Sequence, residues 1–200
     1  MTFAVMSVSP AGDAAWISQD SALWSEEGER VSSSCQKARS VPGRFIFGHS
    51  GDCLMGHQIA LAAWRSADVD SLAENLERDF AAWQSSEPCF VAWAGWSPSL
   101  GRFVGYFTSH ECAMVAETVL RGHVVHPELD AVWTTAYIDA RIIEAHEQMA
   151  RHAMAKQKFI GGVLHTARID RNGISIRDIV DLDRPPPIRR QTHEGDGTAA

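Results

Sequence analysis

Runs of apolar residues bounded by turn-forming residues predict a β-hairpin at each end of the chain. The first pair of runs is separated by Ser9-Pro10-Ala11-Gly12-Asp13, and the last pair by Asp170-Arg171-Asn172-Gly173. In the second turn, Asn-Gly is among the strongest local signals for a tight hairpin. The four predicted strands are residues 3–8, 14–18, 163–169 and 174–179. The chain is therefore expected to begin and end with pairs of antiparallel strands.

Between the hairpins, apolar positions recur at the 3.6-residue period of helices. Two helices are expected in the first half of the chain, and Ser71 and Glu74 have capping-box spacing at the start of the second. A longer helix is expected from about residue 136 to 157, with its stop signal at Gly161-Gly162. The apolar positions of the three helices are Leu54, Met55, Ile59, Leu61 and Trp64; Leu72, Leu76, Phe80 and Trp83; and Ile138, Ile142, Ala145, Met149 and Ala153.

Further short apolar runs predict strands between these helices. They are residues 44–47, 90–96, 103–107 and 114–120. Periodicity alone supports only the α+β class. The order of the elements favours two antiparallel sheets stacked face to face, with helices outside, which is a four-layer α+β sandwich.

The composition narrows the class of protein. Two hundred residues, 45% hydrophobic and 22% charged, are enough for one globular domain with a sizeable core. A formal net charge of -7 argues against a nucleic-acid or anionic-membrane partner, because both require a basic surface. No segment has the pattern of a signal peptide or a membrane span, so we expect a cytoplasmic protein. The four cysteines lack C-x-x-C spacing, so reduced thiols are expected and no cofactor or structural metal is predicted.

Several short segments, taken in order, resemble the proteasome β-subunit and HslV-like group of N-terminal nucleophile hydrolases. The matching segments are Thr2-Phe3-Ala4-Val5, Ile17-Ser18-Gln19-Asp20, Cys35-Gln36-Lys37, Phe45-Ile46-Phe47-Gly48-His49-Ser50-Gly51-Asp52, and Gly161-Gly162-Val163 with the hairpin that follows. The resemblance runs from Thr2 to about Leu182. It implies the αββα sandwich for residues 1–182 and leaves residues 183–200 as a Pro-rich tail, either flexible or an assembly arm.

The resemblance also assigns candidate catalytic residues. Thr2 corresponds to the nucleophile, Asp20 to its acidic partner, Lys37 to a buried ammonium, and Gly48 to the N–H donor for the oxyanion. The chemistry independently needs such groups: a hydroxyl with a base, a cation favouring its deprotonated form, an acid, and a donor aimed at developing charge. The base would be the α-amine of Thr2, with a pKa of about 7.7–8.0, and it exists only if Met1 is removed.

Two functions follow as expectations. The first is a cytoplasmic threonine-type endopeptidase subunit, assembled with copies of itself into a ring or double ring and supplied with peptide by an unfoldase. The alternative is a catalytically inactive assembly protein of the same fold, for example in a phage or virus-like particle, with Met1 retained. A third class is an amidase that acts on a small molecule with the same nucleophile.

Other polar residues give weaker signals. His123 and His126, three residues apart and followed by Glu128, have the beginning of a metal-binding pattern, but no third ligand is evident. A polar loop is the preferred interpretation of that segment. The following residues are interpreted as structural or solvated rather than catalytic: Cys35, His49, His57, His146, His152 and His165.

Overall fold

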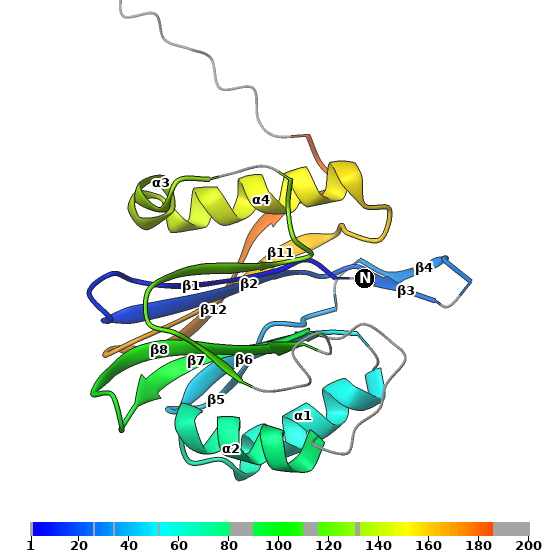
Figure 1. The fold of residues 1–200 in the computed structure, drawn as a ribbon. Helices are drawn as coiled ribbons and strands as arrows, with labels where there is room; N and C mark the ends of the chain where they lie inside the picture. Colours follow the sequence, from blue (N-terminus) through cyan, green and yellow to red (C-terminus); the bar gives the residue numbers. More distant parts are fainter. Residues whose placement is uncertain are drawn as a thin grey trace, which may run out of the picture.

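The protein is a mixed α+β structure with two large antiparallel sheets (Figure 1). In this computed structural model, the described residues are 2–25, 27–33, 35–51, 53–80, 90–109, 116–130 and 133–185. The first sheet consists, in spatial order, of β10 (Gly122–His126), β1 (Ala4–Val8), β2 (Ala14–Asp20), β11 (Val163–Asp170) and β12 (Gly173–Asp181). The second consists of β5 (Arg39–Val41), β6 (Phe45–Ser50), β7 (Phe90–Ser97), β8 (Arg102–Ser109) and β9 (Glu117–Val119). A small third sheet pairs β3 (Leu23–Trp24) with β4 (Arg30–Ser32).

The helices cover the outer faces of the two large sheets (Figure 1). α1 (Cys53–Arg65) and α2 (Val69–Phe80) lie against the second sheet, and α3 (Thr135–Ala140) and α4 (Ile142–Lys156) lie against the first. Met149 and Ala153 of α4 pack on Phe3 and Val5, while Leu72 of α2 belongs to the cluster beneath the second sheet. Both faces of each sheet are therefore partly buried.

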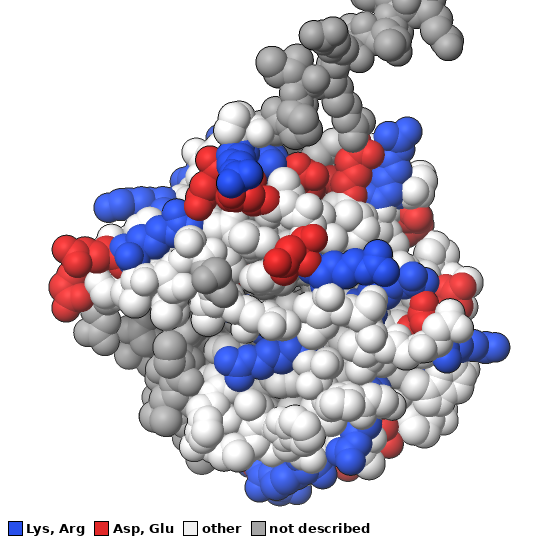
Figure 2. All heavy atoms as spheres, turned by 180° about the vertical axis from the view of Figure 1, so that it is seen from behind, with Lys and Arg blue, Asp and Glu red and all other residues white. Residues whose placement is uncertain are grey.

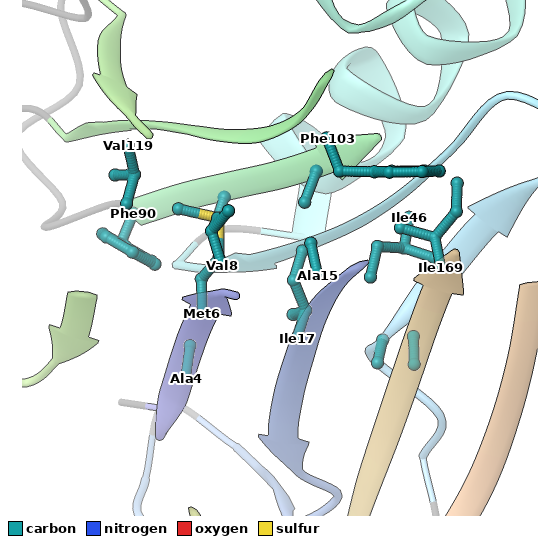
Figure 3. Close-up of a cluster of buried hydrophobic side chains, with 14 residues drawn as sticks. Ala4, Met6, Val8, Ala15, Ile17, Ile46, Phe90, Phe103, Val119 and Ile169 are labelled. Carbon is teal, nitrogen blue, oxygen red and sulfur yellow. The ribbon is translucent and has the colours of Figure 1, made fainter. Parts of the chain in front are cut away.

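The inner faces of the two sheets pack on each other through a second cluster (Figure 3). Met6 and Val8 of β1 belong to the same cluster as Phe90, Phe103 and Val119 from the opposite sheet. All five residues of β1 are buried, because the odd and even positions face different apolar layers. This explains why the first strand is apolar on both faces apart from Ser7, instead of alternating.

Both terminal hairpins predicted from the sequence are confirmed, as is the hairpin formed by β7 and β8. The long helix expected over residues 136–157 is instead two helices. The break is at Arg141, whose φ of -145° and ψ of 48° lie outside helical geometry. The Arg141 N–H donates to the carbonyls of Tyr137 and Ile138, and so it caps α3 before α4 begins.

Two other sequence predictions need correction. The segment around His123 and His126 is not a polar loop but the edge strand β10, which pairs with β1. In α1, Leu61 and Trp64 are 46% and 60% exposed, so this end of the apolar pattern faces away from the core. The predictions for residue 83, for residues 114–115 and for the tail beyond residue 185 fall outside the described residues.

His146 is a fully buried polar residue in the layer between α4 and the first sheet. Its Nε2 lies 2.8 Å from the Ser7 hydroxyl and its Nδ1 lies 2.7 Å from the Ser18 hydroxyl. The Ser18 hydroxyl in turn lies 2.6 Å from that of Thr166, so three neighbouring strands contribute to one polar cluster. Burial, followed by a smaller electrostatic contribution from His123, lowers the pKa of His146 to about 3. The cluster therefore favours a neutral imidazole.

The molecular surface carries both signs of charge. Figure 2 shows Lys and Arg side chains interspersed with Asp and Glu on the face turned away from the view of Figure 1. Within the described residues, no helix is long and apolar enough to cross a membrane.

Candidate functional site

The candidate site is built around the fully buried carboxylate of Asp20, the last residue of β2. Its Oδ1 accepts a hydrogen bond of 2.8 Å from the Phe3 N–H, and its Oδ2 accepts one of 3.2 Å from the Gly161 N–H. Burial raises the pKa of Asp20, while the charge of Lys37 and the two backbone donors oppose that rise. The carboxylate therefore joins the start of β1, the end of β2 and the segment before β11.

Lys37 brings a positive charge to the same place. It lies just before β5, and its residue exposure is 8%. Its Nζ lies 3.5 Å from Asp20 Oδ1 and donates to the Ala22 carbonyl at 2.6 Å. The same ammonium donates to the Thr2 hydroxyl oxygen at 2.9 Å. A buried ammonium needs such partners, since an unpaired charge in the interior is very costly.

Thr2 lies between this ion pair and a pocket of about 270 Å³. The residue is mostly buried, at 8% exposure. The pocket is lined by Thr2, Leu23, Cys35, Lys37, Arg39, His49, Gly51, Gly56 and His57. One wall of the pocket is therefore the hydroxyl that contacts the buried ammonium.

A hydrogen-bonded network near the ion pair holds together the chain segments around Ser21, Ser33 and Val163. The Ser21 hydroxyl donates to the Ser33 carbonyl and accepts from the Val163 N–H at 2.7 Å. Gly162 has a φ of +77°, and an added Cβ would collide with the Ser33 carbonyl and the Ser21 hydroxyl. Glycine is therefore required there by both conformation and space.

The register of the first hairpin brings the start of β1 beside Asp20. In the β1–β2 register, Ala4 pairs with Gln19 and Val8 pairs with Ala15. The residues between the strands form a turn at the opposite end from Asp20, where the Ser9 N–H donates to the Ala14 carbonyl at 3.0 Å. The residues of that turn therefore lie at the far end of the hairpin from Thr2.

Of the four predicted site residues, the structure brings Thr2, Asp20 and Lys37 into one contact network. Gly48 lies in β6, opposite Ala92 of β7, and is not among the lining residues of the pocket. The amide of Gln19 occupies the space where a Cβ at Gly48 would lie. The role of the Gly48 N–H as an oxyanion donor stays a prediction.

The sequence analysis missed part of the pocket. His49 and His57 were interpreted as structural or solvated residues, and His57 is indeed exposed; both also line the pocket, as does Arg39. His49 follows Gly48 in β6 and His57 lies in α1, so the glycine-containing turn between these elements was the available signal. Among the described residues, no three His, Cys, Asp or Glu side chains are grouped as a metal site would require.

Comparisons with protein-family models and with curated proteins found no match. The case for a function therefore depends on the geometry of the site and on the residues that form it.

Proposed function

We propose that this protein is an N-terminal nucleophile amide hydrolase of the proteasome β-subunit and HslV-like type, a threonine-type peptidase that is active once the peptide bond before Thr2 is cut. The observation that carries the proposal is the 2.9 Å contact between Lys37 Nζ and Thr2 Oγ1, with Asp20 behind it. A threonine hydroxyl beside a buried, carboxylate-paired ammonium, at the wall of a pocket, is a combination that hydrolysis by this chemistry requires.

Each group has a defined part in the reaction. The freed α-amine of Thr2 would accept the hydroxyl proton as Oγ1 attacks a substrate carbonyl. The Lys37 ammonium favours negative charge on Oγ1 by hydrogen bonding and by its charge, and Asp20 stabilises that ammonium in a buried setting. The amine then passes its proton to the departing amine of the substrate, leaving an ester on Oγ1. Water attacks this ester with the amine again as base, which releases the acid and restores Thr2.

The architecture supports the same proposal. Two antiparallel sheets pack face to face, and helices lie on their outer faces, as expected for the four-layer αββα sandwich of the group. We extend the proposal to self-association in a ring or double ring of copies, which an unfoldase would supply with peptide. The proposal assigns this fold to residues 1–182.

A second candidate function is a non-catalytic assembly protein of the same fold. One observation favours it: Asp20 and Lys37 together hold the backbone of Phe3, Ala22 and Gly161, so the ion pair has a structural use without any reaction. Such a pair would be retained after loss of activity, because removing one partner leaves a buried charge unpaired. In this alternative, the amide bond before Thr2 stays intact and deprives the hydroxyl of its base.

The deciding experiment measures the N-terminal residue and peptide hydrolysis in the same preparation. Intact mass would give the N-terminus of the purified chain, and a second preparation would be cut by a protease directly before Thr2. We expect hydrolysis of a peptide substrate only by chains that begin at Thr2, retention of activity in Thr2→Ser, and loss in Thr2→Ala. Equal hydrolysis by Thr2→Ala would contradict the proposal. Assembly without hydrolysis in a chain beginning at Thr2 would favour the non-catalytic function.

A further inference from the structure

We infer that the pocket beside Thr2 selects substrates with a carboxylate next to the bond to be cut, and that Arg39 recognises this carboxylate. The inference rests on the proposed function and specifies its substrate class. It is carried by the charges of the pocket wall and by the order of residues along one extended segment.

Among the described residues that line the pocket, the charge balance is positive. The charge of Lys37 is matched by Asp20 behind it. Arg39 is exposed at the start of β5, and within the described part of the chain it makes no ion pair. The described residues that line the pocket include no carboxylate, while His49 and His57 add two imidazoles. The net charge of the described lining therefore comes from the Arg39 guanidinium, which favours an anionic group.

The spacing of Lys37 and Arg39 puts the Arg39 side chain on the same side of the chain as the ammonium that contacts Thr2. Both residues line the pocket, whereas Ala38 between them is fully buried in the core between the sheets. Residues two apart on an extended chain point to the same side, with Cα atoms about 6–7 Å apart. Lys37 contacts Thr2 Oγ1, so Arg39 faces the neighbourhood of a substrate group bound at Thr2. A side chain next to the scissile carbonyl is the part of a peptide that reaches this position.

Another part of the wall, around His49, is held in place by packing. The His49 imidazole lies against Gly56 in the first part of α1, where an added Cβ would collide with the ring. The His49 carbonyl accepts a hydrogen bond of 3.0 Å from Gln19 Nε2, which fixes the strand under the ring. Leu23, which also lines the pocket, offers apolar surface for the methylene groups of a Glu side chain. A pocket with one guanidinium, one fixed imidazole and an apolar side suits an acidic residue.

The test compares peptides that differ only in charge next to the scissile bond: Glu, the isosteric neutral Gln, and Lys. Protein beginning at Thr2 is assayed with Arg39, with Arg39→Gln and with Arg39→Glu. Arg177→Gln is the matched control, because it removes the same charge from β12, away from the pocket. We expect kcat/KM to be about fivefold higher for the Glu peptide than for the Gln peptide. In Arg39→Gln this ratio should fall to about one, and in Arg39→Glu the Lys peptide should become the preferred substrate. The control should keep the ratio of the unsubstituted protein.

Ionic strength and binding give two further readouts. Raising the salt from about 0.05 to about 0.5 M should reduce the Glu preference, since it arises from a partly exposed charge. Binding of fluorescently labelled Glu and Gln peptides to Thr2→Ala protein separates recognition from turnover. If no peptide is hydrolysed but Arg39 still favours the Glu peptide in binding, the proposed catalysis fails and the recognition stands. Equal binding and equal turnover of the Glu and Gln peptides would overturn the inference.

Discussion

Acid should destabilise this protein through the fully buried imidazole of His146. Its two ring nitrogens contact the hydroxyls of Ser7 and Ser18, and burial lowers its pKa from 6.5 to about 3. Between these two pKa values the unfolded chain binds a proton that the folded protein does not. The contribution of His146 to stability is therefore fully present above pH 6.5 and is lost progressively as the pH falls towards 3.

The magnitude follows from linkage. Proton binding to an imidazole with a pKa of 6.5 increases the statistical weight of the unfolded state by a factor of 1 + 10^(pKa − pH). This factor is about 33 at pH 5 and about 1.3 at pH 7. The ratio of about 25 corresponds to about 2 kcal/mol of stability lost between pH 7 and pH 5. Urea unfolding at both pH values measures this loss directly, and His146→Gln removes the titrating group while retaining a polar side chain. The variant should lose about 2 kcal/mol less than the unsubstituted protein between the two pH values.

A control separates titration from loss of packing. Ile138→Val shortens a buried side chain in α3 and should lower the free energy of unfolding by about 1 kcal/mol at either pH. Its dependence on pH should match that of the unsubstituted protein. If His146→Gln and the unsubstituted protein lose the same stability from pH 7 to pH 5, the account of His146 as a buried neutral group is refuted.

Three further predictions concern the site and the core. Lys37→Met should lower stability by about 3–5 kcal/mol, because it leaves the Asp20 carboxylate buried and unpaired, and urea unfolding should show a smaller loss when Asp20→Asn is added. Gly162→Ala should cost about 1–3 kcal/mol through its positive φ and its collision with neighbouring atoms; unchanged thermal unfolding would contradict this. Trp93→Phe should cost about 1–3 kcal/mol, because the Val69 carbonyl loses the 3.1 Å hydrogen bond from Trp93 Nε1 in the core, and an unaltered urea midpoint would argue against that contact.

Local turn chemistry made the two terminal hairpins predictable. Asn172-Gly173 fixes the tight turn of β11 and β12, and the cluster from Ser9 to Asp13 marks the first turn. Apolar periodicity found the helices, but it gave no sign of the break at Arg141 because the pattern continues through it. β10 was missed for a related reason. Its residues are only partly buried at a sheet edge, so their sequence carries little apolar signal.

The site was predictable to the extent that its residues follow a pattern along the chain. Thr2, Asp20 and Lys37 were placed by the order of their segments, and the structure brings them within contact. Backbone groups such as the Gly161 N–H and the Ala22 carbonyl have no residue-type signature, so their roles required the fold. The lining of the pocket likewise depends on how β6 and α1 lie beside the start of β5.

The central claim is that Thr2 Oγ1 becomes an activated nucleophile when the bond before Thr2 is cut. The most direct test is to incubate chains beginning at Thr2 with a peptide β-lactone and to locate the acyl group by mass spectrometry. The account predicts one acyl group on the Thr2 side chain, about tenfold or more slower labelling in Lys37→Met, and no labelling at this site when Met1 is retained. Labelling at Thr2 that is equally fast with Met1 in place and in Lys37→Met would contradict it.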